Sequence, residues 1–286
     1  MVLQPKAIFL DMDGTILNHS NQVSNNTKEV IDELREKGIF VFVATGRSFG
    51  EIADIVPKGF TVDGIVSSNG MIVHIGNELV VENTLPLDLV NEVIEKARKH
   101  KVYYEVFPNQ GPRVTLMEDR HYVEAEIEDP KPDSVGINEW TSRKEALDKE
   151  IAWKKELDSD KFSKFYFFSK RKDHINMWKS ELDELKKKID FTTSISSEHN
   201  VELMVANVNK ATGIQHILDE FKLSSKDILV IGDSDNDLPM FEFAGYSVAM
   251  KNAPDHIKEV VNEVTEFSCD EDGVCRYLKR FLKNGV

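Results

Sequence analysis

Two aspartates, Asp11 and Asp13, stand two residues apart directly behind the apolar run Ala7-Ile8-Phe9-Leu10. The run predicts a parallel strand buried on both faces, and open α/β sheets place their active sites at the carboxyl ends of such strands. Alternation along an extended chain would turn both carboxylates to one side, where they can share a cation or divide nucleophile and acid/base roles. Gly14 then permits a tight turn. An isolated Asp-x-Asp-Gly is also ordinary turn chemistry, so the pair alone does not decide between a site and a turn.

Three further segments carry residue types that complement the two aspartates. Thr45-Gly46 follows the apolar run 39–44, Lys210 opens an apolar-periodic segment, and the acidic run 233–237 follows the apolar run 228–231. Because the carboxyl ends of parallel strands lie along one edge of a sheet, these distant segments can converge there. Carboxylates are the hard oxygen ligands that Mg²⁺ prefers, while lysine, a hydroxyl and backbone amides bind phosphate. The four segments together predict a site for Mg²⁺ and a phosphate group.

The elements that must position these residues alternate between strand and helix at both ends of the chain. Strands are expected at 7–10, 39–44, 64–67 and 228–231, and helices from Asn26 or Thr27 to Gly38 and over 210–221. Asn69-Gly70 predicts a small hairpin after the third strand. Repeated strand-helix units of this kind predict an α/β fold, a Rossmann-like doubly wound and mostly parallel sheet.

The middle of the chain has a different pattern. Helices are expected at 87–100, 137–157 and 173–188, strands at 102–107, 113–117, 164–168 and 191–195, and a loop at 126–136. Several of these strands alternate polar with apolar residues, which is typical of an antiparallel sheet with one solvent-facing side. We therefore expect an inserted α+β domain over 84–195, between a first core part, 1–83, and a second, 196–286.

Composition restricts the class of partner. The chain has 286 residues, 41% of them hydrophobic, and a formal net charge of −14. Such a charge argues against nucleic acid or an anionic membrane as the main partner, because both would repel it. No basic start precedes a long apolar stretch, and no run approaches the roughly 20 apolar residues of a membrane span. We expect a cytoplasmic protein whose partners are neither nucleic acid nor membrane.

The cysteines and histidines show no familiar metal-binding spacing. Cys269 and Cys275 match neither the zinc C-x-x-C pattern nor a secreted disulfide framework, so free thiols are expected. The eight histidines form no H-x-x-x-H pair and are expected to be structural or exposed.

The acidic run 233–237 has competing interpretations. Asp233, Asp235 and Asp237 match the opening of an EF-hand loop, but the sixth position is Leu238 and the twelfth is Ala244, where glycine and glutamate are needed. The chain also has no G-x-x-x-x-G-K-[ST] and no G-x-G-x-x-G, which excludes a nucleotide P-loop and leaves a dinucleotide site without support. A solvated acidic loop would explain this run but not the other three segments.

Four short motifs occur in order along the chain. They are Asp11-x-Asp13-Gly14-Thr15, Ala44-Thr45-Gly46-Arg47, Asn209-Lys210-Ala211 and Gly232-Asp233-x-x-Asn236-Asp237, accompanied by Ser68-Asn69-Gly70 and by the segments 248–253 and 272–274. This set resembles the haloacid dehalogenase (HAD) superfamily and, more narrowly, its Cof-type phosphatases. In that group an α/β cap is inserted between the second and third motifs, where the inserted domain is expected here. One departure is Ala211 after Lys210, where many relatives have glycine.

The resemblance implies a mechanism. Asp11 would attack phosphorus and form an aspartyl-phosphate, and Asp13 would protonate the leaving oxygen and then deprotonate the hydrolytic water. Mg²⁺ would be held by Asp11, the backbone carbonyl of Asp13 and Asp233.

The remaining motif residues are implied to bind the phosphoryl group or to orient other residues. The phosphoryl oxygens would be bound by the Met12 amide, Thr45, Gly46, Lys210 and Asn236. Asp237 would orient Asp233 or Lys210 without binding the metal directly. Arg47 would either act in the site or simply pair with a nearby carboxylate.

The function implied by the resemblance is hydrolysis of a small phosphorylated metabolite. Aspartate at the acid/base position favours hydrolysis of a phosphate ester over dehalogenation. The expected substrate is a phosphate monoester, with a sugar phosphate among the candidates. A sugar phosphomutase of the same superfamily is an enzymatic alternative, and a non-catalytic protein that binds phosphorylated metabolites is another.

Overall fold

The computed structural model describes residues 4–283, apart from the side chains of residues 53 and 54. The chain forms two compact units: the first runs to Glu82 and resumes at Val208, and the second is Asn83–Asn207. Each unit has its own sheet and its own hydrophobic core.

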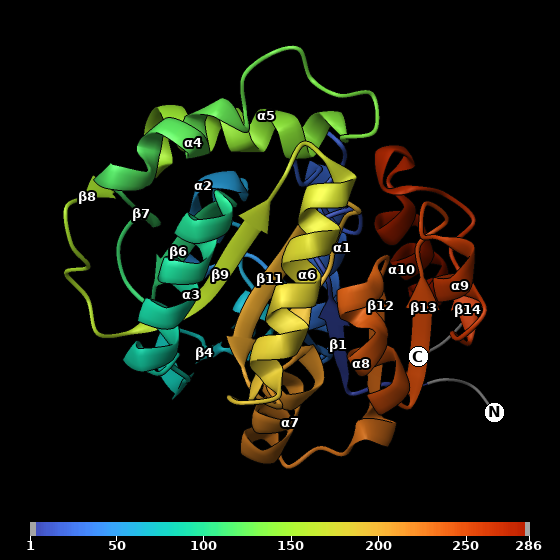
Figure 1. Ribbon diagram of the computed structural model, residues 1–286. Coiled ribbons are helices and arrows are strands. Elements are labelled where there is room, and N and C mark those ends of the chain that lie inside the picture. The colour runs from blue at the N-terminus through green and yellow to red at the C-terminus, as the bar shows by residue number, and fades with distance from the viewer. Residues whose placement is uncertain (1–3, 284–286) are drawn as a thin grey trace. The chain divides into compact units, whose positions relative to one another are not determined.

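The first unit is built on an eight-stranded sheet with the strand order β14-β13-β12-β1-β2-β3-β4-β5 (Figure 1). Its strands are β1 (Ala7–Leu10), β2 (Phe40–Ala44), β3 (Gly64–Ser67), β4 (Ile72–Ile75), β5 (Glu78–Glu82), β12 (Ile228–Gly232), β13 (Tyr246–Ala249) and β14 (Glu263–Val264). Neighbouring strands from β14 to β3 are parallel. Strand β4 pairs antiparallel with both β3 and β5. This confirms the predicted doubly wound, mostly parallel sheet.

Helices cover both faces of this sheet because its strands are apolar on both sides. They are α1 (Asn25–Glu36), α2 (Phe49–Ile55), α7 (Lys210–Phe221), α8 (Leu238–Phe243), α9 (Asp255–Lys258) and α10 (Gly273–Lys283). Ile8 and Leu10 belong to one core cluster with buried residues of α1 and α10, while Phe9 belongs to the other with residues of α7 and α8. Alternate residues of β1 thus point to opposite faces, as the period of an extended strand requires.

Helix α1 begins earlier than the sequence predicts. It starts at Asn25, and the Ser24 hydroxyl caps it by accepting a hydrogen bond of 3.0 Å from the Thr27 amide. The prediction of Asn26 or Thr27 as the cap is therefore wrong. A serine hydroxyl satisfies the same free amide equally well, so the four polar residues 24–27 offer several equivalent starts.

The second unit contains a six-stranded sheet with the strand order β10-β11-β9-β6-β7-β8. Its strands are β6 (Tyr103–Pro108), β7 (Val114–Leu116), β8 (Ala152–Lys154), β9 (Phe162–Phe168), β10 (Phe191–Ser194) and β11 (Asn200–Val205), and its helices are α3 (Leu87–His100), α4 (Arg120–Ala125), α5 (Ile137–Glu145) and α6 (Lys172–Lys186). The predicted helix over 137–157 is wrong at its end. After α5 a single π-helical segment stops at Glu150, and residues 152–154 pair with β7 as a parallel strand.

The predicted solvent-facing side of this sheet is also wrong, because every residue of β6 and β9 is buried. Helix α5 and Arg113, the residue before β7, supply partners for polar side chains of these strands. Arg143 and Arg113 donate to the buried Glu105, and the Tyr166 hydroxyl donates to Glu139 at 2.7 Å. Buried polar groups persist when they are hydrogen-bonded, so a polar strand position does not by itself indicate exposure.

The second unit extends past the predicted end of the insertion at residue 195. Strand β11 pairs antiparallel with both β9 and β10 and therefore belongs to the inserted sheet. The chain rejoins the first unit at Val208, twelve residues later than expected, whereas the first boundary differs from the prediction by one residue. A strand has the same sequence pattern in either sheet, so only its hydrogen-bonded neighbours assign it.

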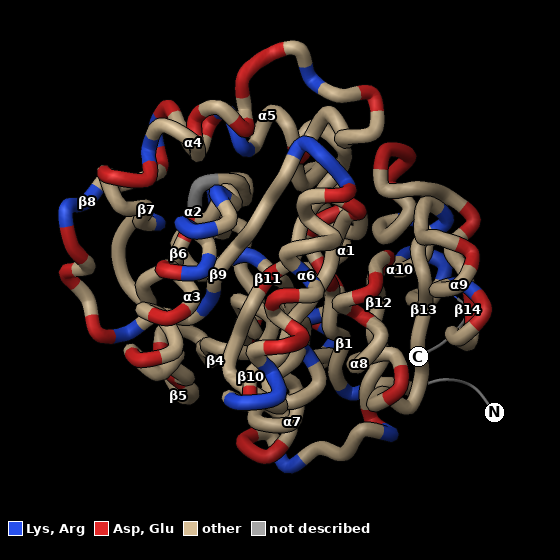
Figure 2. The backbone as a smooth tube through the Cα atoms, in the orientation of Figure 1, with Lys and Arg blue, Asp and Glu red and all other residues tan. Residues whose placement is uncertain are grey.

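Charged residues are mixed along both units. Figure 2 shows acidic and basic positions interspersed along the traced chain. Within residues 4–283, no helix is long and apolar enough to cross a bilayer.

Candidate active site

The predicted site residues lie at one edge of the sheet of the first unit. Leu10, the last residue of β1, is in register with Val43 of β2 and Ile231 of β12. The segments that follow these three strands therefore leave the sheet side by side. The first residue of each segment is a predicted site residue: Asp11 after β1, Thr45 after β2 and Asp233 after β12.

Lys210 is the cation at the centre of this edge. It is the first residue of α7, it is fully buried, and its Nζ donates to Asp11 Oδ1 at 2.6 Å and to Asp237 Oδ1 at 2.5 Å. Such a lysine is stable in the interior only because two carboxylates compensate its charge. Alanine at position 211, where many relatives have glycine, does not disturb the start of α7, because Asn209 caps the helix normally. The helix packs closely against β3 at Gly213 instead, where a Cβ would lie 2.4 Å from Val66.

Asp237 uses both of its oxygens to position other groups. Oδ1 accepts from Lys210, and Oδ2 accepts from the backbone amides of Asp233 at 2.8 Å and Ser234 at 3.0 Å. Gly232 makes room for this side chain, because a Cβ there would lie 2.5 Å from its Cγ. These contacts support the expected orienting role of Asp237.

A group of carboxylates could hold a metal ion here. Oxygens of Asp11, Asp233 and Asp237 all lie within 4.8 Å of one another. Asp233 Oδ2 accepts from Asn252 Nδ2 at 3.1 Å, while its buried Oδ1 has no hydrogen-bond partner among the residues that the structure describes. Three carboxylates against the single ammonium of Lys210 leave two negative charges, which one divalent cation would balance. The donor set is all oxygen, so these residues fit Mg²⁺.

The electrostatics of the group favour binding of a cation. Burial, together with neighbouring Asp237, raises the pKa of Asp11 to about 7, even though Lys210 acts in the opposite direction. Burial and the charge of Asp11 also raise the pKa of Asp233. Two neighbouring carboxylates that resist ionisation are typical of sites that bind a cation.

Asp13 has a partner of its own. Arg47 donates to it from Nε at 2.8 Å and from Nη2 at 2.5 Å, and the Asp13 side chain is 53% exposed. Asp11 and Asp13 therefore contact different cationic side chains. This arrangement favours separate roles for the two aspartates over one cation shared by both carboxylates. Arg47 therefore pairs with a nearby carboxylate that is itself a predicted site residue, and its role in the site stays a prediction.

The turn that carries these aspartates is tight. The Met12 carbonyl accepts from the amides of Thr15 and Leu17, and the Met12 side chain is buried. Gly14 adopts φ +74°, and a Cβ there would lie only 2.1 Å from Asp233 Oδ2. Glycine is therefore required at this position by both its backbone conformation and the close approach of Asp233.

The predicted phosphate-binding residues lie next to a strained turn. Thr45 is fully buried, and its Oγ1 accepts from the Arg47 amide at 3.1 Å. Asn236 Nδ2 donates to Asn69 Oδ1 at 3.2 Å, and a Cβ on Gly46 would lie at the same distance from that oxygen. Asn69 has φ 54° within the 3₁₀ turn Ser68–Gly70, whose residues all have positive φ. Strain of this kind concentrates at functional sites.

Comparison with known proteins identifies the family. A sequence model of the haloacid dehalogenase-like hydrolases matches residues 8–278. The chain belongs to this family. The resemblance to Cof-type phosphatases is thereby confirmed, and the HAD protein is a phosphatase, a hydrolase that acts on phosphoric monoesters.

Relatives match the HAD protein over nearly its whole length. It is 28% identical to the 5-amino-6-(5-phospho-D-ribitylamino)uracil phosphatase YitU of Bacillus subtilis, over 99% of both chains. It is 27% identical to the phosphatase YwtE of the same organism, which carries the same activity name, over 97% of this chain and 98% of that one. A solved HAD-like hydrolase structure from B. subtilis is 26% identical, with a TM-score of 0.80 over 96% of this chain and 99% of that one.

Two residues of the HAD site were not predicted as site residues. Asn69 follows β3, and Asn252, which follows β13, donates to both Asp233 Oδ2 and the Gly14 carbonyl, the latter at 2.9 Å. Asn69 was noted as part of a predicted turn and of the family resemblance, and Asn252 only as part of the resemblance. Asn69 lies two residues past the end of β3 and Asn252 three residues past the end of β13, so both are at the same sheet edge but are not the residue directly after a strand.

Proposed function

We propose that this HAD phosphatase hydrolyses a small phosphate monoester in a Mg²⁺-dependent reaction that passes through an aspartyl-phosphate on Asp11. The observation that carries the proposal is the buried ion cluster in which Lys210 bridges Asp11 and Asp237 beside Asp233. It combines a carboxylate nucleophile, a fixed cation and an all-oxygen set of metal ligands at one sheet edge.

The proposed reaction has two displacements at phosphorus. An Asp11 oxygen forms a bond to phosphorus while the bond to the leaving oxygen breaks, and Asp13 gives that oxygen its proton. Water then attacks the aspartyl-phosphate, Asp13 takes its proton, and the bond between Asp11 and phosphorus breaks to release phosphate. Arg47 donates hydrogen bonds to both oxygens of Asp13. We therefore expect at least one of these hydrogen bonds to break when Asp13 gives its proton to the leaving oxygen.

The remaining residues would bind the metal ion and the phosphoryl oxygens. Asp11, Asp233 and the Asp13 carbonyl would hold Mg²⁺, which when bound supplies positive charge to the phosphoryl oxygens. Lys210, Thr45, Asn236 and the amides of Met12 and Gly46 would bind those oxygens and prevent their repulsion by Asp11.

The substrate class follows from the relatives. Both curated relatives act, by name, on a phosphorylated ribityl group carried by a uracil. We propose a phosphorylated sugar or sugar alcohol as the substrate class of this chain. We also propose that the second unit acts as the cap that selects among such compounds, the role that the family resemblance implies.

The test is phosphate release from a panel of phosphorylated metabolites, including the ribitylaminouracil phosphate, with and without Mg²⁺. Asp11→Asn should abolish release, whereas Asp235→Asn, in the same loop as Asp233 but exposed and bonded to His256, should retain it. Activity undiminished in Asp11→Asn would refute the assigned nucleophile. Isomerised sugar phosphate with little free phosphate would indicate a phosphomutase instead.

The aspartyl-phosphate can be trapped with a good leaving group. With p-nitrophenyl phosphate, departure of the leaving group needs little help from an acid, but hydrolysis of the intermediate still needs a base. Asp13→Asn should therefore accumulate a phosphorylated protein that mass spectrometry locates on Asp11. Asp13→Asn protein that turns over this compound normally would contradict the role of Asp13.

A further inference from the structure

A second group of metal-binding side chains lies outside the carboxylate cluster. It consists of His19, Cys269 and Asp270, whose donor atoms all lie within 4.8 Å of one another. His19 Nδ1 lies 2.5 Å from Asp270 Oδ2 and 3.9 Å from Cys269 Sγ. Some 250 residues separate His19 from the other two, so no sequence spacing predicted this cluster.

The carboxylate and the thiol both approach the same nitrogen of His19. In a nucleophile-imidazole-carboxylate triad the carboxylate contacts one ring nitrogen and the nucleophile contacts the other. Here the same nitrogen, Nδ1 of His19, faces both Asp270 and Cys269. That arrangement cannot pass a proton through the ring, but it is the arrangement in which three side chains bind one cation.

The backbone holds the cluster in place. The His19 amide donates to Asp270 Oδ1 at 2.9 Å, and the Cys269 amide donates to Asn252 Oδ1 at 3.0 Å. Asn18 stabilises the turn around His19, because its Oδ1 accepts from the amides of Ser20 and Gln22. Little backbone rearrangement is therefore needed for the three side chains to act together, which lowers the cost of binding.

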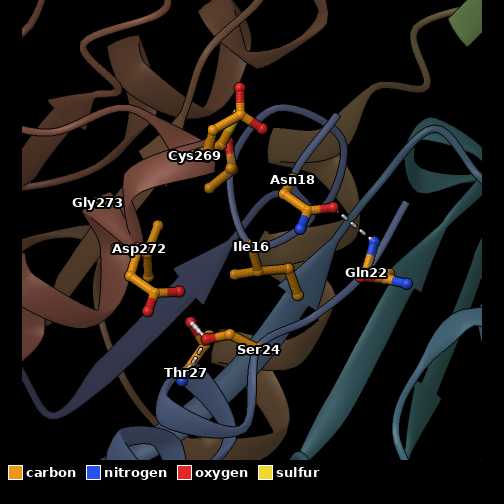
Figure 3. A pocket seen from close by; sticks show the side chains of 11 residues that line it. Ile16, Asn18, Gln22, Ser24, Thr27, Cys269, Asp272 and Gly273 are labelled. Atoms are coloured by element: carbon orange, nitrogen blue, oxygen red, sulfur yellow. Dashed lines mark hydrogen bonds between the residues drawn. The ribbon is translucent and has the colours of Figure 1, made fainter. Parts of the chain in front are cut away.

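A polar cavity adjoins the cluster. Cys269 and Asp270 line a space of about 30 Å³, together with Thr15, Asn18 and Asp272 (Figure 3). The buried Thr15 hydroxyl in its wall has no hydrogen-bond partner within the described part of the chain. A cavity of this size and polarity can hold one or two waters, which could complete the coordination of a bound ion.

The donor chemistry differs from that of the carboxylate cluster. One sulfur, one imidazole nitrogen and one carboxylate form the borderline-soft set that Zn²⁺ uses when a fourth position is open. Burial and the charges of Asp270 and Asp233 raise the pKa of Cys269 to about 11. The free thiol is therefore a poor nucleophile, whereas a thiophilic metal displaces its proton on binding.

We propose that His19, Cys269 and Asp270 bind a divalent cation of the Zn²⁺ class at a site separate from the proposed Mg²⁺ site. The His19 and Asp270 side chains are 59% and 50% exposed, so they can separate enough to admit an ion between them. Asn252 connects the two sites, since it accepts from the Cys269 amide and donates to Asp233. This proposal does not rest on the proposed phosphatase mechanism.

The test is a Co²⁺ titration of the metal-free full-length protein in saturating Mg²⁺. Co²⁺ bound by a thiolate gives a charge-transfer absorption band in the near ultraviolet, which an all-oxygen site cannot give. We expect this band to saturate at one equivalent in the wild type and in Cys275→Ser, whose buried thiol instead contacts the Asn26 carbonyl. Added Zn²⁺ should displace Co²⁺ and remove the band.

Variants of the three ligands complete the test. Cys269→Ser should lose the band, and His19→Gln and Asp270→Asn, which change exposed side chains, should each weaken Co²⁺ binding at least about 10-fold. No band in the wild type, a band retained in Cys269→Ser, or unchanged affinity in both His19→Gln and Asp270→Asn would overturn the proposal. Because the readout is absorption, failure here leaves the proposed phosphatase function untouched.

Discussion

Lys210 Nζ lies 2.6 Å from Asp11 Oδ1, and both side chains are buried in the interior of the first unit. Lys210→Met keeps the length and removes the charge, so Asp11 and Asp237 lose the cation that is hydrogen-bonded to both of them. We expect phosphate release to fall about 100-fold or more, because a preorganised charge is lost. The free energy of unfolding should fall by about 3–5 kcal/mol, as for other broken buried pairs.

The matched control for this prediction is Lys226→Met. Lys226 is exposed in the first unit, so the same substitution there should change neither property appreciably. Steady-state kinetics and urea unfolding of both variants check the prediction. Near-normal activity in Lys210→Met would show that the ammonium is structural only.

Gly14→Ala should damage the site more than the fold. The added Cβ would lie 2.1 Å from Asp233 Oδ2, and φ at this position is +74°. Gly38→Ala is the control, because it has φ +81° but open space around the added Cβ. Both should lose about 1–2 kcal/mol of stability from the backbone, and only Gly14→Ala should also lose Mg²⁺ binding and activity. Equal activity in the two variants would contradict the packing argument.

Stability of the metal-free protein should depend on the ionisation of Asp11. Its pKa is raised from 3.8 to about 7 in the folded protein, so the folded state binds the proton more tightly than the unfolded state does. The stability linked to this proton is complete below 3.8 and is lost as the pH rises to about 7. Asp11→Asn cannot lose a proton, so its stability relative to the wild type should increase across this range.

Chemical unfolding of both proteins in chelator, at several pH values within that window, measures the difference. Mg²⁺ should stabilise the wild type more at neutral than at acidic pH, because at acidic pH it must displace the proton. A difference between the two proteins that does not change with pH would show that Asp11 titrates normally.

Asn252→Ala should weaken metal binding without preventing chemistry. Asn252 Nδ2 holds Asp233 Oδ2 and the Gly14 carbonyl together from outside the carboxylate cluster. Removing such an orienting partner typically costs about 10- to 100-fold in metal affinity. The Mg²⁺ concentration for half-maximal activity should rise by that factor, with kcat at saturating Mg²⁺ largely kept.

Asn262→Ala provides the control for Asn252. Asn262 Oδ1 also bridges neighbouring groups, accepting from the Ser247 amide at 2.8 Å, but it lies near β14 and contacts none of the site carboxylates. Its Mg²⁺ dependence should equal that of the wild type. A lower kcat in Asn252→Ala with unchanged Mg²⁺ dependence would assign Asn252 to substrate binding instead.

Glu105→Gln should destabilise the second unit. Glu105 is fully buried and accepts from Arg113, Arg143 and the Tyr103 hydroxyl, so the change removes the negative charge that faces two buried guanidinium groups, of which Arg113 keeps an ion pair with Glu150. The expected loss is about 3–5 kcal/mol in denaturant unfolding. Glu124→Gln, which breaks an exposed pair with Arg120, should cost less than about 1 kcal/mol. Similar losses in the two variants would refute the buried-charge argument.

Strand ends were the most informative signal in the sequence. A run such as 7–10 is apolar at every position only when both faces are covered, and the polar residue that follows must then lie at the sheet edge. The same rule located Thr45 and Asp233, and helical periodicity placed Lys210 at the start of α7. These are local patterns, which is why they can be read without coordinates.

Contacts between distant residues were the part that the sequence did not reveal. The pairing of Arg47 with Asp13, the bridge made by Asn252 and the cluster of His19 with Cys269 each join side chains whose spacing carries no pattern. Strand β11 could not be assigned to its sheet for the same reason, since only pairing with β9 and β10 places it.

Residue order and the apolar pattern are enough to place Asp11 and Asp13 at the end of a buried strand. Their contacts, Lys210 for Asp11 and Arg47 for Asp13, exist only in the folded protein. Partners of this kind are chosen by distance, burial and charge among residues that folding brings together. The division of the two aspartates between a buried ion cluster and an exposed arginine pair is therefore a property of the folded chain.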